Sequence, residues 1–279
     1  MPVQGPSHQS RRAAPAHRRH CRGPQCFRGS GGGPREPDRG HQDCRTHLGL
    51  LPLFPALAGV LGLILRIWLF STIDEKGLLP AKHIADTLLY ILTAVTLGIL
   101  FLATRDLRSI RNGSARLTSI LGCILGSAGL LFTGLLYLSN TAAQFSTLAA
   151  AACMIGGITL LAMAILMFLR KEISYGFGAI LTVCLILYTV TNCKSWGTVS
   201  QLQEYFFPLM AAIFLILSAY HFTLLSASQG KPQQLAFFSQ GALFFCCVCL
   251  NTGQWPLYLG MLCWAAVQLY LCIPAQKEA

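Results

Sequence analysis

Acidic residues are scarce in this chain: 10 Asp and Glu stand against 21 Lys and Arg among 279 residues. Charged residues of both signs make up only 11% of the sequence, whereas hydrophobic residues make up 54%. A soluble helical protein of this length needs charged outer faces on its helices. The scarcity of charge therefore argues against a soluble globular domain.

Motifs that carry enzymatic chemistry are absent as well. The sequence contains no Gly-x-x-x-x-Gly-Lys-Ser/Thr loop, so we do not expect the chain to hydrolyse ATP by itself. It contains neither His-Glu-x-x-His nor Gly-x-Ser-x-Gly, which disfavours a zinc protease and a serine hydrolase. The sequence assigns no catalytic residue and leans away from an enzyme.

Eight apolar runs fill nearly all of the chain after the first 48 residues. A helix needs roughly 20 apolar residues to cross a bilayer. Because backbone polar groups in lipid must be satisfied within the segment, each run is expected to be α-helical. The runs are Leu50–Phe70, Ile84–Ala103, Leu117–Leu138, Phe145–Leu169, Ile173–Thr191, Tyr205–Leu225, Leu235–Leu250 and Pro256–Ile273.

The sequence thus predicts an all-α fold, a polytopic transmembrane helix bundle over residues 49–274, followed by a short cytoplasmic tail at 275–279. The seventh run, Leu235–Leu250, is short and contains Gln240 and Gly241. We expect eight spans, or seven if this run is re-entrant.

Positive charge falls on alternate connections between the runs, as the positive-inside rule describes for cytoplasmic loops. Connections on one side carry Arg105, Arg108, Arg111, Arg116, Arg170, Lys171, Lys231 and Lys277. The opposite side carries only Lys76, Lys82 and Lys194. We therefore predict a protein of the cell membrane with both termini in the cytoplasm and the lipid bilayer as its first partner.

Residues 1–48 differ sharply in composition, with nine Arg, no Lys and few apolar residues. Such a segment cannot bury enough surface to fold. We expect it to be disordered, or to arise from a gene start assigned too early. Its cysteines, Cys21, Cys26 and Cys44, form no tight Cys-x-x-Cys pair, so no metal, cofactor or nucleic-acid partner is predicted.

Two ionisable side chains stand out within the runs. Arg66 lies one turn from the outer end of the first run, and Asp86 lies in the first turn of the second. A short connection joins these runs, so both side chains fall at a similar depth. We predict a structural ion pair between Arg66 and Asp86, because each charge is costly in lipid without a partner.

The predicted outer face holds the candidate ligand site. His83 and Asp86 are three residues apart on one helix face, and the preceding connection adds Asp74 and Glu75. With Trp196 and Trp255 they form a candidate site for a ligand. Aromatic residues gather near the same boundary, as an interfacial belt or as a ligand-binding cluster: Trp68, Tyr137, Tyr188, Trp196, Tyr205, Trp255 and Tyr258.

Small residues recur every four positions, a spacing that lets helix backbones approach closely. Gly122 and Gly126 show it within one run, and Gly129 follows three residues later. Pro55 and Pro208 lie early in the first and sixth runs and are expected to kink them. The segments around these prolines, Phe54–Ala58 and Phe207–Ala211, resemble each other and are predicted to run in opposite directions, an arrangement known from transporters.

Three functional classes remain. The first is a small permease or a membrane subunit of a transport system, with a partner membrane or ATPase subunit. The second is a non-catalytic sensing or interaction protein that binds a ligand or partner on its outer face. The third is a membrane enzyme that uses His83 and Asp86 as acid and base, which ranks last because no nucleophile stands out.

Overall fold

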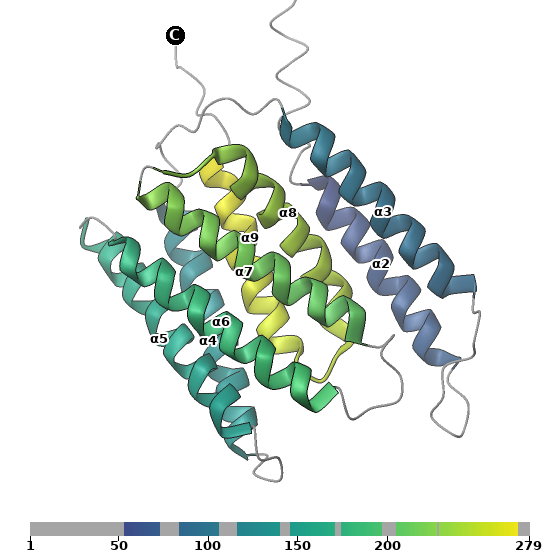
Figure 1. Ribbon diagram of the computed structural model, residues 1–279, viewed down its shortest axis with the longest axis horizontal. Coiled ribbons are helices and arrows are strands. Elements are labelled where there is room, and N and C mark those ends of the chain that lie inside the picture. Colours follow the sequence, from purple (N-terminus) through teal and green to yellow (C-terminus); the bar gives the residue numbers. More distant parts are fainter. Residues whose placement is uncertain are drawn as a thin grey trace, which may run out of the picture. The chain divides into compact units, whose positions relative to one another are not determined.

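The computed structural model describes residues 53–72, 84–105, 116–139, 146–170, 174–196, 205–227 and 229–272, all within one compact unit. The segments predicted as tails, 1–48 and 275–279, lie outside them. The described residues form eight α-helices, one 3₁₀ helix and no strand (Figure 1). These are α2 (Leu53–Ser71), α3 (Ile84–Arg105), α4 (Arg116–Ser139), α5 (Ser146–Phe168), α6 (Tyr175–Trp196), α7 (Phe206–Ser226), α8 (Pro232–Val248), η2 (Cys249–Asn251) and α9 (Trp255–Cys272).

Among the described helices, seven are long and apolar enough to cross a membrane: α2 to α7, and α8 together with η2. Helix α9 adds 18 residues without a charged side chain. Large apolar side chains such as Ile64 and Phe101 are more than half exposed on the outside of the bundle, as lipid-facing positions require. The chain is therefore a multi-pass transmembrane helix bundle, as predicted.

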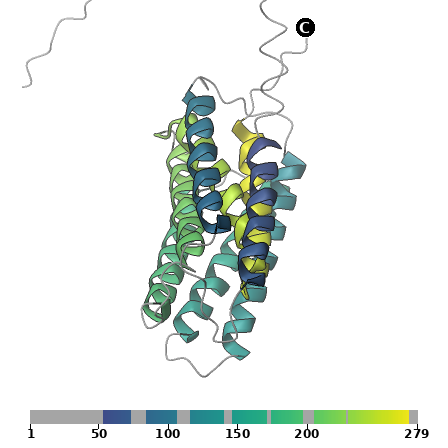
Figure 2. The same ribbon diagram turned by 90° about the vertical axis from the view of Figure 1, so that its right-hand side faces the viewer.

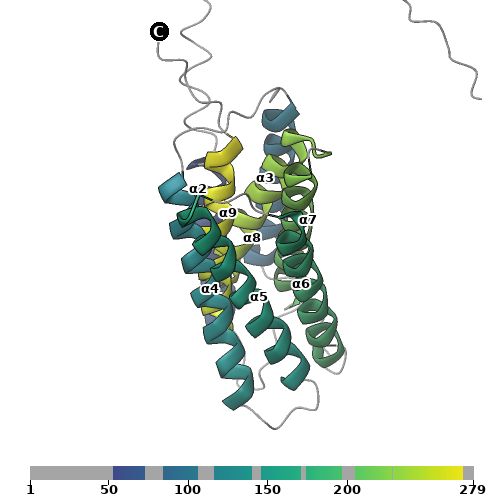
Figure 3. The ribbon, with the colours of Figure 1, turned by 90° about the vertical axis from the view of Figure 1, so that its left-hand side faces the viewer.

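The helices run side by side, roughly parallel or antiparallel to one another (Figure 2, Figure 3). Each of α2 and α4 to α8 packs against the helix that follows it in the chain. Contacts between helices distant in sequence close the bundle: α9 packs against α4, and α8 packs against α2 and α3.

Helix α8 is the most buried of the seven candidate spans, which explains its polar and small residues. Gln240 and Gly241 are buried among neighbouring helices and do not face lipid. A Cβ at Gly241 would lie 2.2 Å from the ring of Phe214 in α7, so glycine permits this close packing. The segment forms one helix of 17 residues, extended by η2, and not a re-entrant pair.

The two prolines lie in first turns. Pro208 is the third residue of α7, and Pro55 is the third residue of α2 as described. A proline there removes no intrahelical hydrogen bond, because the first N–H groups of a helix have no partner within it. Both helices continue past these residues, so the prolines begin helices and do not produce the expected kinks.

Contacts between helix ends show that helices of the bundle run in alternate directions. The ends of α4 and α6 meet the start of α9 through hydrogen bonds among Tyr137, Asn192 and Gln254. At the opposite end, the Gln233 amide of α8 donates to the carbonyl of Arg105, the last residue of α3 (2.9 Å). The end that holds Gln254 is called the outer end below, following the charge pattern of the sequence.

The orientation gives a prediction that reporter fusions can check. Because Arg105 at the end of α3 and Lys231 at the start of α8 lie at the end opposite Gln254, a cytoplasm-active reporter fused after Lys231 or Lys277 should be active. A periplasm-active reporter at the same positions should be silent, and one inserted after Gly253 should be active. The reverse pattern would contradict the assignment of the outer end.

Candidate functional site

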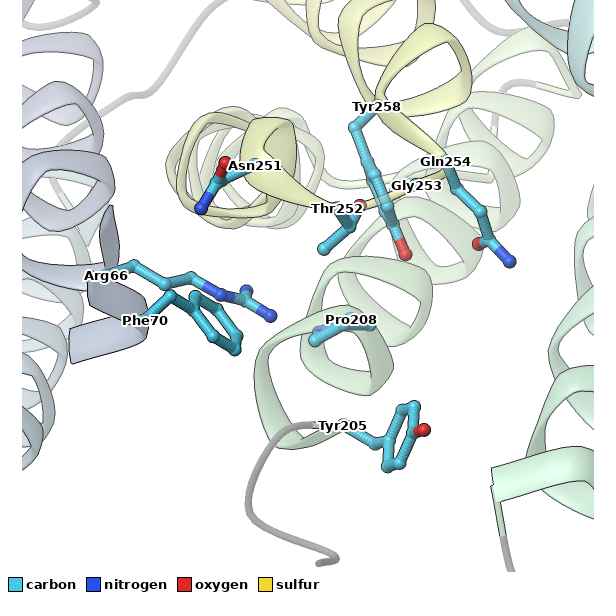
Figure 4. A pocket seen from close by; sticks show the side chains of 9 residues that line it. All are labelled: Arg66, Phe70, Tyr205, Pro208, Asn251, Thr252, Gly253, Gln254 and Tyr258. Carbon is cyan, nitrogen blue, oxygen red and sulfur yellow. The ribbon is translucent and has the colours of Figure 1, made fainter. Parts of the chain in front are cut away.

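A pocket of about 260 Å³ opens at the outer end of the bundle, between the end of α2, the start of α7 and the connection from α8 to α9 (Figure 4). Among the described residues, its lining contains one charged side chain, five uncharged polar side chains (two Tyr, and one each of Asn, Thr and Gln) and apolar walls. The lining residues are Arg66, Phe70, Tyr205, Pro208, Asn251, Thr252, Gly253, Gln254 and Tyr258.

Arg66 reaches this pocket because of how α2 packs. Residues with helical spacing, Gly59, Gly62 and Arg66, form part of its buried face. A Cβ at Gly59 would lie 2.6 Å from Cβ of Cys247, and one at Gly62 would lie 2.7 Å from Cγ2 of Val248. The two glycines therefore bring α2 close to α8, and Arg66 follows one turn later on the same face.

The guanidinium of Arg66 contacts a thiol and two aromatic rings. The residue is only 3% exposed, and its Nη1 lies 3.5 Å from Sγ of Cys249. Its Cζ lies 5.4 Å from the ring centroid of Phe70 and 5.6 Å from that of Phe207. These rings attract the cation through their faces, and they fix the side chain so that it points into the pocket (Figure 4).

The turn between α8 and α9 forms another wall. After η2 ends at Asn251, Thr252 takes an extended backbone conformation. The Thr252 hydroxyl donates to the carbonyl of Cys249 (2.7 Å), and the Trp255 amide donates to the carbonyl of Thr252 (3.0 Å). These bonds make the turn a defined part of the pocket and place the Asn251 amide along its edge.

Behind the pocket lies a cluster of hydrogen-bonded side chains from α4, α6 and the turn. The Tyr137 hydroxyl donates to Oδ1 of Asn192 (2.8 Å). The Gln254 amide donates to Tyr137 and accepts from the Tyr188 hydroxyl. Asn192 in turn donates through Nδ2 to the carbonyl of Tyr188 (2.9 Å). Both ends of the Gln254 amide are engaged, so this cluster holds the wall of the pocket rigid.

Tyr258 joins the pocket to the bundle interior. It is 2% exposed, and its hydroxyl points into the pocket from α9, while the guanidinium of Arg66 enters from α2 (Figure 4). The pocket thus presents a cation and a hydroxyl to one small space. Such a pair suits recognition of an oxygen-rich anion, because guanidinium groups bind carboxylates and phosphates through paired N–H donors.

The predicted site residues have separate positions. Arg66 lines the pocket, and Asp86 is half-buried in the first turn of α3 and is not among the lining residues. Asp74, Glu75 and His83 lie outside the described residues. The Arg66–Asp86 ion pair and the ligand role of these residues stay predictions.

Of the two predicted tryptophans, Trp255 does not line the pocket, and the side chain of Trp196 lies outside the described part of the structure. Trp196 is the last residue of α6. Trp255 is 51% exposed and lines a different, apolar hollow of about 420 Å³ between α4 and α9. Trp255 therefore follows the pocket-lining turn in sequence but faces another surface.

The interpretation of the outer aromatics as a belt holds for only some of them. Trp68 and Trp255 are about half exposed, as residues at a membrane interface are. Tyr188 and Tyr258 are 3% and 2% exposed and lie inside the bundle. For these two the belt interpretation was wrong, because their hydroxyls belong to the polar end of the interior.

Most of the lining was not singled out in the sequence. The sequence identified Tyr205 and Tyr258 only as aromatic residues near the membrane boundary. It identified Asn251–Gln254 only as a connection between two apolar runs. The one available signal was that this short connection carries Asn, Thr and Gln and no charge. Within the part of the chain that the structure describes, no group of three or more His, Cys, Asp or Glu is placed to hold a metal ion.

Comparison with known proteins adds no relative: no family model, no curated protein and no solved structure matches the chain.

Proposed function

We propose that this membrane protein binds a small carboxylate in the pocket at Arg66, and that the pocket is the outer solute site of a small permease. One observation carries the proposal: a buried guanidinium lines a pocket at one end of a transmembrane bundle. A guanidinium lining a pocket suits an anionic ligand, because its planar N–H donors bind carboxylate oxygens in pairs.

The size and walls of the pocket narrow the solute. A volume of about 260 Å³ lies just below the usual range for drug-sized ligands, so the solute is small. Phe70, Tyr205 and Pro208 offer apolar contact, and Asn251 and Tyr258 offer hydrogen bonds. These features support a monocarboxylate with a short apolar or aromatic part.

Transport is supported by the surroundings of the pocket. The helical segment of α8 and η2 ends at the pocket, and the turn that follows lines it. The similar segments Phe54–Ala58 and Phe207–Ala211 begin α2 and α7, which both supply lining residues.

The alternative is a sensing or interaction protein that binds a ligand without moving it. Rings fill the interior beneath the pocket: Phe207 and Phe214 both lie against Phe245, with ring centroids 6.5 and 5.0 Å apart. Close packing of this kind favours a receptor over an open path. A partner ATPase subunit would supply the energy for transport, and a partner subunit of a sensing protein would pass on its signal.

Binding can be tested with simple probes on the full chain in lipid nanodiscs. Benzoate and acetate should raise the Tm, because a ligand that binds only the folded state stabilises it by mass action. Choline at equal concentration and ionic strength should not. A Tm that rises equally with choline, or with neither carboxylate, would contradict a carboxylate site.

Uptake then separates the two functional classes. If the chain is a permease, proteoliposomes should accumulate radiolabelled benzoate faster than protein-free vesicles, beyond its passive diffusion. Tm stabilisation without uptake would instead favour the sensing alternative.

A further inference from the structure

Five side-chain atoms buried in the described bundle have no hydrogen-bond partner. They are Oγ1 of Thr96, Nδ1 of His221, both Nε2 and Oε1 of Gln240, and Oε1 of Gln268. Gln240 is the most unusual, because it is fully buried in α8 and both ends of its amide are unsatisfied. Buried polar groups are nearly always hydrogen-bonded, so each exception calls for an explanation.

The membrane makes these atoms more costly than they would be in a soluble protein. No water surrounds the bundle at this depth, and an unsatisfied amide in an apolar medium costs several-fold more than one near solvent. Thr93 shows the usual solution on the same helix as Thr96, since its hydroxyl donates to the carbonyl of Leu89 (2.8 Å). Thr96 does not make this bond.

Thr96 and Gln240 lie at nearly the same depth. Helices α3 and α8 are antiparallel, since the end of α3 meets the start of α8, and Phe101 packs on Phe237 with ring centroids 6.2 Å apart. From that contact toward the outer end, Thr96 is five residues away and Gln240 three. At 1.5 Å per residue their levels differ by roughly 3 Å.

Gln268 of α9 lies at a similar depth on another neighbour of α8. It follows Gln254 in the outer turn by 14 residues, whereas Gln240 precedes Asn251 in that turn by 11. The two levels differ by roughly 5 Å, which is within the reach of two glutamine side chains. Helices α3 and α9 each pack on α8, so the three helices bring unsatisfied polar atoms to a similar level.

We infer that α3, α8 and α9 enclose a water-binding site near the middle of the bundle, with Gln240 as its main donor and acceptor. Buried waters commonly make two to four hydrogen bonds to polar groups that are otherwise unsatisfied, and these three residues supply that number. The site lies along α8 about 13 Å from Cys249, which contacts Arg66. It is therefore separate from the outer pocket and does not depend on the function proposed for it.

Radiolytic footprinting tests the site on the full chain in nanodiscs. Hydroxyl radicals made from a bound water oxidise the side chains beside it, and Phe244 lies one turn from Gln240 on the same helix face. Phe244 is fully buried, so oxidation of its ring above background is expected only if water is enclosed. Met163 of α5 is equally buried and oxidises more readily, so it sets the background. Labelling of Phe244 no higher than that of Met163 would overturn the inference.

The substitution Gln240→Leu gives a second test, because it should change the Tm in opposite directions for a dry site and for a site that holds water. If the site is dry, Gln240→Leu removes an unsatisfied amide and should raise the Tm. If it holds water, the same change removes the water's main partner, and we expect the Tm to fall by about 2–4 °C and Phe244 labelling to fall severalfold. A Tm equal to or above that of the wild type would overturn the inference.

Two controls keep the test decisive. Gln233→Leu makes the same change on α8 where the amide is near the end of the bundle, and it should leave Phe244 labelling unchanged. If Gln240→Leu does not accumulate, Thr96→Val is compared with Thr93→Val. Only Thr96→Val should lower the labelling of Phe244, and equal labelling in both variants would overturn the inference.

Discussion

Gly129→Ala is expected to destabilise the bundle by about 3 kcal/mol, and Gly129→Leu is expected to abolish folding. A Cβ at Gly129 would lie 2.5 Å from the carbonyl oxygen of Pro256 and 2.9 Å from Cα of Gly260. These are backbone atoms of α9, so they cannot move aside as a side chain can. Any added atom must push α4 and α9 apart, which also opens the packing on either side of the contact.

Thermal unfolding in detergent, followed by tryptophan fluorescence, measures the effect. Gly98→Ala is the matched control, because a Cβ at Gly98 of α3 would meet nothing within 4 Å. That variant should unfold at the wild-type temperature or slightly above it, since alanine favours a helix more than glycine does. A Gly129→Ala protein that unfolds within about 2 °C of the wild type would refute the expectation.

The spacing of small residues in the sequence predicted this close packing but not its partner. In the structure the stripe follows α9: Gly122 lies against Val267, Gly126 against Trp264, and Gly129 against Gly260. A four-residue spacing identifies one face of a helix. It carries no information about which of seven other helices will cover that face, because that choice depends on the packing of the whole bundle.

Span positions were predictable for a related reason. Lipid requires long, apolar and uninterrupted segments, so the predicted boundaries fall near those observed; the second run begins at Ile84 in both. The largest departure is the end of α6, at Trp196 and not at Thr191. The start of α8 also differs, since it begins at Pro232 and not at Leu235. Hydropathy underestimates the length of α8 because this helix is surrounded by protein and not by lipid. Polar residues can find partners there, as the hydroxyls of Ser239 and Ser218 do (2.8 Å).

The pocket was only partly predictable. Arg66 drew attention because a cation within an apolar run is rare, and it does line the pocket. Neutral polar residues at helix ends, such as Asn251 and Thr252, look like ordinary interfacial positions. They become part of a site only because the ends of α2 and α8 and the starts of α7 and α9 meet, which no local pattern encodes.

Arg66→Met is expected to weaken benzoate binding by about 100-fold, or roughly 3 kcal/mol, while the bundle stays folded. Methionine fills much of the same volume without a charge and keeps apolar contact with the rings of Phe70 and Phe207. Arg66→Lys should recover part of the affinity, because it keeps the charge but loses paired N–H donors and contact with the rings of Phe70 and Phe207. Isothermal titration with benzoate, beside the Tm of each variant, measures both effects.

The predicted pair with Asp86 makes a competing account testable in the same experiment. If Arg66 serves only to neutralise Asp86, then Arg66→Met should be unstable, and adding Asp86→Asn should restore both the Tm and benzoate binding. If Arg66 binds the carboxylate, the double variant recovers no binding whatever its Tm, because the group that contacts the anion is missing. The coupling between the two substitutions thus assigns the charge of Arg66 to the fold or to the ligand. Restored binding in the double variant would exclude Arg66 as the anion-binding residue.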